Sequence, residues 1–313
     1  MFIGWLTCIP AVLLPHSLCR FTTANAPANR QMPIASVVRG SYKKKKNMTL
    51  EPIVFNDLGE IRNLQPTDWG DIIPDIEFYI KSTFCNPIKA TIDNKIAGIG
   101  TVMIFENTSW IAHIIVNINY RNKGIGSRIV NELLRKIKED SIDTCSLIAT
   151  DLGKPVYLKA GFRIETEYIF LKRDKQWIEC PVSKNVIRFE EKYRTAIYEL
   201  DKVISGENRE LLLKDYLDNS LLYIENENVV GYYLPDLKEG LIFADTNEAG
   251  LELMKLKYST VDKAVIPIEN IRGLEFLKQK GFIETSKGTR MVFGKELNWN
   301  PSKMYSRIGG NFG

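Results

Sequence analysis

The sequence contains few of the residues that build metal sites and disulfide frameworks. Only two of its 313 residues are histidines, His16 and His113, and the five cysteines are scattered without a CxxC pair. A structural zinc site needs about four such ligands at close spacing, so no metal is expected. The scattered cysteines also exclude a disulfide framework. Proteins without such a framework are typical of a reducing compartment, so we expect a cytoplasmic protein.

The first 47 residues lack acidic side chains altogether. They carry seven Lys or Arg, whereas residues 48–313 carry 35 basic and 38 acidic groups. The positive net charge therefore lies in this segment and gives no reason to expect a nucleic-acid partner. Its apolar stretch, residues 2–14, contains Pro10 and is too short to span a membrane as a helix. We interpret residues 1–47 as a leader: a targeting segment, a tail, or sequence upstream of a true start at Met48.

A basic turn with two glycines, residues 116–127, is the most informative segment of the chain. It follows an apolar run, residues 110–116, that predicts a strand, and it opens a helix over residues 127–139 whose apolar side chains recur at helical spacing. Such a turn gathers unpaired N–H groups at the positive end of a helix dipole. The segment therefore predicts a phosphate site.

The spacing of the glycines and basic residues excludes two common classes of phosphate-binding loop. A P-loop would require a lysine followed by a hydroxyl residue after its last glycine, and a dinucleotide fingerprint would require a third glycine where Ile129 stands. What remains is R-x-x-G-x-G, with Arg121, Gly124 and Gly126. The glycines allow close approach to a pyrophosphate, and Arg121 and Lys123 add positive charge.

Together with residues 149–162, this turn resembles motifs A and B of the GNAT superfamily of N-acetyltransferases. The resemblance covers residues 50–173 and implies that acetyl-CoA is the co-substrate, with its pyrophosphate on the turn and its pantetheine arm along strand 110–118. Thr150 stands where GNAT proteins often have an asparagine that contacts CoA. The cofactor-binding residues implied are Val116, Ile118, Arg121, Asn122, Lys123, Gly124, Ile125, Gly126, Ser127 and Thr150.

Two residues are candidates for catalysis. Tyr157 stands at the position of the GNAT general acid, and a phenol of pKa about 10 can protonate a leaving thiolate; the alternative is a packed core aromatic. His113 is a candidate base for the amine, or else a hydrogen-bonded core histidine sharing a face with Ile111 and Ile115. Asp151 or a water relay are further possibilities. The aromatics that line either a tunnel or the core are Trp69, Phe78, Tyr79 and Trp110.

The expected fold is mixed α/β. Strands are predicted at residues 88–92, 96–105, 110–118, 144–149 and 165–171, with helices at 57–64, 68–79, 127–139 and 154–160. The earlier helices include Thr67 as a cap and Pro74 as a kink. This order is that of the GNAT fold, a mostly antiparallel mixed sheet flanked by helices.

A second, related unit is expected after residue 173. Residues 270–282 align without gaps on 150–162, but Leu277 replaces Tyr157, and residues 243–250 contain no R-x-x-G-x-G. The last segment is similar to a tandem-GNAT group with an Acetyltransf_18-type second domain. We therefore expect a catalytic domain at 48–173, a linker at 174–185 and a degenerate GNAT-like domain at 186–313.

The predicted activity is transfer of an acetyl group from acetyl-CoA to a primary amine, by direct attack in a ternary complex. The amine acceptor is a small molecule or a peptide that the sequence does not identify. No nucleic-acid or membrane partner is expected, and the chain is expected to be a monomer or homodimer. The alternative function is a non-catalytic acyl-CoA sensor, in which the second domain passes the binding state to a partner.

Overall fold

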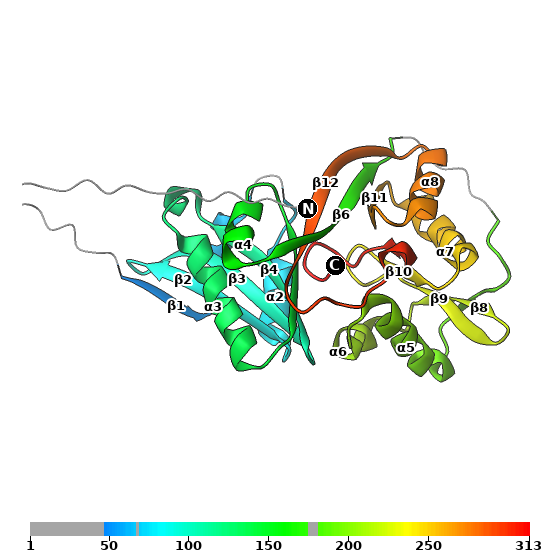
Figure 1. The fold of residues 1–313 in the computed structure, drawn as a ribbon, viewed down its shortest axis with the longest axis horizontal. Coiled ribbons are helices and arrows are strands. Elements are labelled where there is room, and N and C mark those ends of the chain that lie inside the picture. Colours follow the sequence, from blue (N-terminus) through cyan, green and yellow to red (C-terminus); the bar gives the residue numbers. More distant parts are fainter. Residues whose placement is uncertain (1–46, 67–68, 175–180) are drawn as a thin grey trace, which may run out of the picture. The chain divides into compact units, whose positions relative to one another are not determined.

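A computed structural model describes residues 47–66, 69–174 and 181–313, which belong to one compact unit beginning at residue 46. Nearly all of the expected leader, and the expected cap Thr67, lie outside these residues. The first half of the described chain runs to residue 174 (Figure 1). Its helices and strands are β1 (Met48–Pro52), α1 (Leu58–Ile61), α2 (Ile73–Lys81), β2 (Cys85–Ile92), β3 (Lys95–Phe105), β4 (Thr108–Val116), α3 (Ile125–Glu139), β5 (Thr144–Ala149), α4 (Lys154–Ala160) and β6 (Arg163–Lys172).

The predicted order of elements is confirmed from residue 57 onward, but strand β1 was not predicted, and two expected helices near the beginning need correction. The first expected helix is only partly α-helical, because 3-10 turns at Phe55–Asp57 and Arg62–Leu64 flank α1. The second begins at Ile73 rather than residue 68, and Asp71 Oδ1 accepts a hydrogen bond from the Ile73 N–H at 3.0 Å. Pro74 thus lies in the first turn, where a missing N–H costs nothing, and causes no kink.

The second half follows a similar order of elements (Figure 1). Its helices and strands are β7 (Val186–Arg188), α5 (Arg194–Ser205), α6 (Glu210–Leu213), β8 (Leu221–Glu225), β9 (Asn228–Leu234), β10 (Leu241–Ala244), α7 (Asn247–Thr260), β11 (Lys263–Pro267), α8 (Ile271–Gln279), β12 (Ile283–Gly294) and β13 (Met304–Ser306).

The sequence repeat has a matching local structure at the ends of α4 and α8. Both helices are followed by a glycine with positive φ, +97° at Gly161 and +82° at Gly281. In both, the next phenylalanine N–H donates at 3.0 Å to the carbonyl five residues earlier, that of Tyr157 or Leu277. Glycine is favoured there because a left-handed conformation has little steric cost without a Cβ atom.

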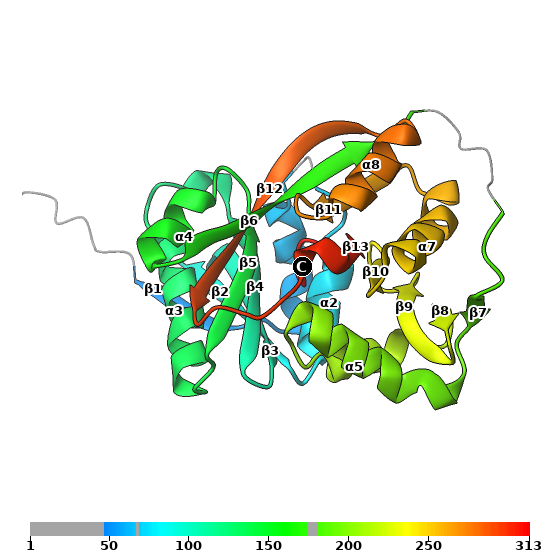
Figure 2. The same ribbon diagram turned by 45° about the vertical axis from the view of Figure 1, so that its right-hand side comes forward.

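Strands of the second half are built into the sheet of the first. The eight-stranded sheet has the order β1-β2-β3-β4-β5-β12-β6-β11, and a five-stranded sheet has the order β13-β10-β9-β8-β7. Figures 1 and 2 show β12 lying along β6 as a long pair. All pairings are antiparallel except β4 with β5, as expected for a mixed, mostly antiparallel sheet. The eight-stranded sheet therefore contains strands of both halves, whereas the five-stranded sheet consists of second-half strands alone.

Three apolar cores hold these layers together. One lies beneath α3 and α4, and it contains the predicted stripe of α3, now seen to be buried. Each such side chain contributes roughly 1.5–3 kcal/mol through its transfer from water. A second core lies on the opposite face of β3 and β4 and is continuous with side chains of α5, β9 and β10. A third lies under α7 and α8.

Candidate functional site

Strand β4 contains a bulge at His113. This residue has a φ of +50°, and the pairing of β3 with β4 shifts register between Ile99 and Thr101. Gly100 lies opposite the bulge, and a Cβ atom there would come within 2.6 Å of Ile114 Cδ1. The missing side chain at Gly100 therefore makes room for the extra residue in β4.

The parallel pairing of β4 with β5 runs only from Thr108 to Trp110, so the two strands separate before the bulge is reached. The Asn117 N–H donates to the Ala97 carbonyl at 3.0 Å, toward β3. Because N–H groups alternate along a strand, those of Ile114 and Val116 point toward the edge that β5 leaves. Val116 was predicted to lie at this edge, and Ile114 was not.

The R-x-x-G-x-G turn places six N–H groups together at the beginning of α3. Gly124, with φ of +77°, is the residue before the helix, and Asn122 also has a positive φ. Within the described part of the chain, the N–H groups of residues 122–127 make no hydrogen bond, and the first helical bond is that from Arg128 to the Gly124 carbonyl. No side chain caps this end of the helix.

Basic side chains are fixed beside these N–H groups. Arg121 Nε donates to the Val116 carbonyl at 3.2 Å, and Lys123 Nζ donates to the Asn119 carbonyl at 2.8 Å. A Cβ atom on Gly124 would meet nothing within 4 Å, so the space beside it is open. Unpaired N–H groups at the positive end of a 15-residue helix, flanked by two cations, fit a pyrophosphate. Ile118, expected at the end of the strand, instead lies in a 3-10 turn and is exposed.

Tyr157 lies on α4 within the core beneath α3. Its ring makes an edge-to-face contact with Phe162 at 5.8 Å between centroids. Burial raises the pKa of the phenol, and a nearby Cys145 thiol adds to the shift, so the hydroxyl stays protonated at neutral pH. No group among the described residues hydrogen-bonds to this hydroxyl. The nearby Thr150 hydroxyl accepts from the Gly153 N–H at 3.3 Å and orders the turn before α4.

His113 belongs to a polar cluster on the opposite face of β4. Its Nδ1 lies 2.9 Å from the Tyr79 hydroxyl, and Asn311 Nδ2 donates to the same hydroxyl at 2.8 Å. With that donor in place, the Tyr79 hydroxyl donates to Nδ1, and Nε2 carries the imidazole proton toward Asp75 Oδ2 at 3.6 Å. Burial lowers the pKa of His113 to about 4, so the ring is neutral at pH 7.

The bulge also changes which residues share a face with His113. Ile115 packs on the same side as Tyr79, whereas Ile111 packs beneath α3. The expectation that His113 shares a face with both isoleucines is therefore wrong for Ile111, because an extra residue reverses the alternation of the strand. Four aromatic residues were expected to line either a tunnel or the core. Of these, Tyr79 and Trp110 are fully buried, and Trp69 is partly exposed, with its ring centroid 6.0 Å from that of His113.

Sequence reasoning missed the partners of His113 in this cluster. Asp75 precedes Tyr79 by one turn of α2, whereas Asn311 and Lys238, whose ammonium contacts Asp75 Oδ1, come from the second half. Only the spacing of Asp75 and Tyr79 on one helix could have indicated that they lie together. Asn311 and Lys238 are brought to the cluster by chain segments far away in the sequence.

The corresponding position of the second half is filled by the chain itself. Thr246 Oγ1 accepts a hydrogen bond from the Ala249 N–H at 3.2 Å and so caps α7. Strand β13 pairs along β10, and a Cβ atom on Gly250 would lie only 2.3 Å from the ring of Tyr305. Neither an open strand edge nor an open helix end remains for a phosphate.

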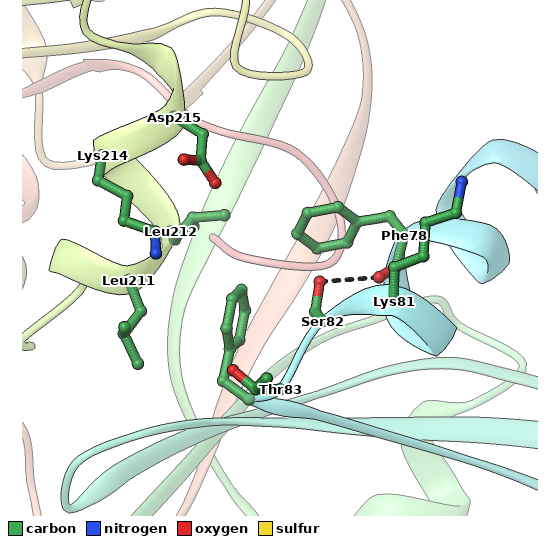
Figure 3. Close-up of a pocket in the computed structure, with 9 residues that line it drawn as sticks. Phe78, Lys81, Ser82, Thr83, Leu211, Leu212, Lys214 and Asp215 are labelled. Atoms are coloured by element: carbon green, nitrogen blue, oxygen red, sulfur yellow. Dashed lines mark hydrogen bonds between the residues drawn. The ribbon is translucent and has the colours of Figure 1, made fainter.

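Two hollows in the surface are bordered by residues of the first half. One, of about 340 Å³, lies between α2 and α6; Figure 3 shows Phe78 and Leu212 pointing toward one another across it, with the Ser82 hydroxyl bonded to the Phe78 carbonyl. It contains none of the predicted site residues except Phe78. The other, of about 720 Å³, is polar and is bounded by Glu60, Asn117 and Lys123. This second hollow adjoins the R-x-x-G-x-G turn.

Neither a membrane-spanning helix nor a cluster of metal ligands is found in the residues that the structure describes. None of the helices in this part of the chain is both long and apolar enough to cross a bilayer. Across the same residues, no group of three or more His, Cys, Asp or Glu side chains is arranged to hold a metal ion.

Family models match both halves of the chain. A family model described as an acetyltransferase (GNAT) domain matches residues 79–172, and another with the same description, Acetyltransf_18, matches residues 197–306. Among curated proteins, none matches the sequence.

Solved structures show the same fold. A putative acetyltransferase from Pyrococcus horikoshii has a TM-score of 0.72 at 18% identity, over 85% of this chain and 96% of its own. A GCN5-related N-acetyltransferase from Sphaerobacter thermophilus has a TM-score of 0.58 at 13% identity, over 81% and 98%. A glucosamine N-acetyltransferase region of a fungal multi-domain β-N-acetylglucosaminidase has a TM-score of 0.60 at 13% identity, over 79% and 38%.

Proposed function

The chain belongs to the GNAT acetyltransferases and carries two GNAT domains in tandem, and from this premise we propose that its first half transfers an acetyl group from acetyl-CoA to a primary amine. The second half contributes strands and side chains but no cofactor site of its own. The acceptor is proposed to be a small molecule or a peptide that attacks directly in a ternary complex.

The observation that carries this proposal is the unpaired end of α3. Six N–H groups of residues 122–127 converge there without partners among the described residues, and the cations of Arg121 and Lys123 lie next to them. Such groups suit the diphosphate of CoA, because N–H groups and a helix dipole stabilise negative charge. From that point the separated edge of β4 runs toward the bulge, so the pantetheine arm is proposed to lie along it.

The N–H groups of Ile114 and Val116 are proposed to hold the thioester carbonyl. Oriented N–H groups are already in place when negative charge develops on that oxygen, and their stabilisation requires no rearrangement. Tyr157, whose hydroxyl has no hydrogen-bond partner within the described chain, is proposed to protonate the CoA thiolate as it leaves. Its raised pKa keeps the proton available at neutral pH.

His113 is proposed to help remove the proton of the amine. The imidazole is neutral at pH 7, and Asp75 faces its Nε2. Because Tyr79 already donates to Nδ1, the ring takes up a proton only if the hydrogen bonds of the cluster shift together. His113 therefore acts with Asp75 and Tyr79 as one unit, and Asp75 is its connection to solvent.

The test is to mix the purified chain with acetyl-CoA and a panel of amines while release of free thiol is followed. We expect release that depends on the amine, and calorimetry should detect saturable binding of CoA. Saturable binding without release for any amine would instead support the acyl-CoA sensor. If CoA does not bind, both functions are ruled out.

A further inference from the structure

The ammonium of Lys238 lies beside the bulge of β4. Lys238 Nζ forms an ion pair with Asp75 Oδ1, while the other oxygen of this carboxylate lies 3.6 Å from His113 Nε2. The same ammonium lies 5.6 Å from the ring centroid of Phe78, a favourable cation–π position. A lysine of the second half thus meets the polar cluster proposed to receive the proton of the acceptor amine.

The turn that carries Lys238 is held rigidly. Lys238 has a φ of +55°, and the next residue, Glu239, donates its N–H to the Ile308 carbonyl at 2.8 Å. The Glu239 carboxylate forms a two-point ion pair with Arg307 at 2.8 and 2.7 Å. Lys257 Nζ donates to the carbonyls of Glu239 and Gly240. These contacts fix the direction in which Lys238 leaves the turn.

The Lys238 amine contacts the cluster that is proposed to take up the proton of an acceptor amine. His113, which faces Asp75, is adjacent in the chain to Ile114, whose N–H is proposed to hold the thioester carbonyl. We propose that Lys238 is itself an acceptor and is acetylated within its own chain. This inference rests on the proposed function, because it requires acetyl-CoA on the separated edge of β4.

The chemistry of this step balances without another reactant. The Lys238 ammonium first loses a proton to Asp75, which is 24% exposed and can pass it to solvent. The neutral Nζ attacks the carbonyl carbon, a C–N bond forms, and the C–S bond breaks. Tyr157 protonates the CoA thiolate as it leaves, and the second nitrogen proton restores the Tyr157 hydroxyl, so the products are acetyl-lysine, CoA thiol and one proton.

The surroundings of Lys238 favour this reaction over a purely structural ion pair. Its side chain is 26% exposed, and burial lowers the pKa of the ammonium, so a larger fraction is the neutral amine than at an ordinary surface lysine. The Asp75 carboxylate contacts both the Lys238 ammonium and the His113 imidazole, whereas a purely structural ion pair consists of one cation and one anion. An external primary amine would compete with Lys238 for the same carboxylate.

The experiment uses the full chain, isotopically labelled acetyl-CoA, and peptide mass spectrometry to follow individual lysines. Lys255 is the matched control, since it is 24% exposed and is also ion-paired to a carboxylate, Glu252, but lies on α7 away from the cluster. We expect Lys238 to be labelled at least tenfold faster than Lys255, at a rate independent of protein concentration. Lys238→Arg keeps the charge and should abolish the label at residue 238 without changing that at Lys255, and Asp75→Asn should slow labelling of Lys238 at least tenfold.

The outcomes separate this inference from the proposed function. Labelling of Lys238 no faster than Lys255, in protein that binds CoA by calorimetry, would overturn the inference whether or not external amines react. A rate that rises in proportion to protein concentration would also overturn it, because the reaction would then occur between chains. Absence of CoA binding would instead overturn the proposed function, and the inference with it.

Discussion

The ends of α3 and α7 are the clearest comparison within this molecule. Both helices follow a strand that corresponds to β4 in chain order, but α3 begins with unpaired N–H groups behind Gly124, whereas Thr246 caps α7. The strand edge next to α3 is open, and the edge next to α7 is occupied by β13 and Tyr305. One fold thus leaves a helix end open, as at the proposed diphosphate site, or closes it through a cap and one covering segment.

The ends of the later helices differ in the same way. Tyr157 and Leu277 occupy equivalent places, with the same hydrogen bond to the phenylalanine that follows, yet only the first has a group that can donate a proton. Leu277 is fully buried and serves packing. The fold of the second half is therefore maintained by its apolar core, without the phenol that is proposed to act in the first half.

The largest expected effect concerns the proton donor. Tyr157→Phe keeps the ring against Phe162 but removes the hydroxyl, so turnover should fall by roughly 10²–10⁴-fold with little change in CoA affinity. Steady-state kinetics would measure turnover, and calorimetry would measure CoA affinity. A variant with unchanged turnover would show that Tyr157, like Leu277, serves only packing.

A negative charge at the open helix end should remove cofactor binding. In Gly126→Asp the new Cβ lies near only Val116 Cγ2, at 3.6 Å, so the fold should be retained. The carboxylate would compete for the N–H groups, and hydrogen bonds to charged groups contribute about 1.5–3 kcal/mol each, so CoA should bind about 10- to 150-fold more weakly. Calorimetry tests this, and unchanged affinity would remove α3 as the diphosphate site.

The equivalent change at the blocked helix end should affect stability alone. In Gly250→Ala the Cβ atom would overlap the buried ring of Tyr305, and overpacking of this kind costs typically about 1–3 kcal/mol. Denaturant unfolding should show that loss, while CoA affinity of the folded protein stays unchanged. Reduced affinity in this variant would mean that the second half also takes part in binding.

The smallest expected effect is a pH dependence of stability that arises in the first half alone. His113 is the only histidine after residue 16, and burial lowers its pKa from 6.5 to about 4. Between these values the unfolded chain binds a proton that the folded chain does not, so stability falls as pH falls through this window. From pH 7.5 to pH 6 the loss should be about 1 kcal/mol.

Urea unfolding of the parent chain and of His113→Gln at both pH values measures this contribution. The loss should be present in the parent and absent in the variant, since the second half, residues 186–313, contains no histidine. Parallel pH profiles would show that His113 is not the titrating group.

Much of the first half followed from local sequence signals. Apolar runs predicted β3, β4 and β5, and the 3.6-residue period predicted α3 with its buried face. The matching glycine and phenylalanine at residues 161–162 and 281–282 predicted the second unit. These signals are strong because they depend on each segment's own conformation and burial.

The polar cluster could not be predicted in this way. His113 contacts Tyr79 because a bulge turns it away from α3, and no single-sequence pattern locates a bulge opposite Gly100 with confidence. Asn311 and Lys238 reach the cluster from segments more than 120 residues away. Their positions depend on how β12 and the turns of the second half pack, which involves many weak contacts at once.

By itself the sequence determined the two GNAT units, the glycine turn before α3 and the missing turn before α7, because each is a property of a short segment. Three features are visible in the folded chain alone: β12 lies between β5 and β6, β13 covers the edge of β10, and Lys238 pairs with Asp75. Strand partners and side-chain neighbours depend on which surfaces meet, and a linear pattern of residues contains little information on that choice.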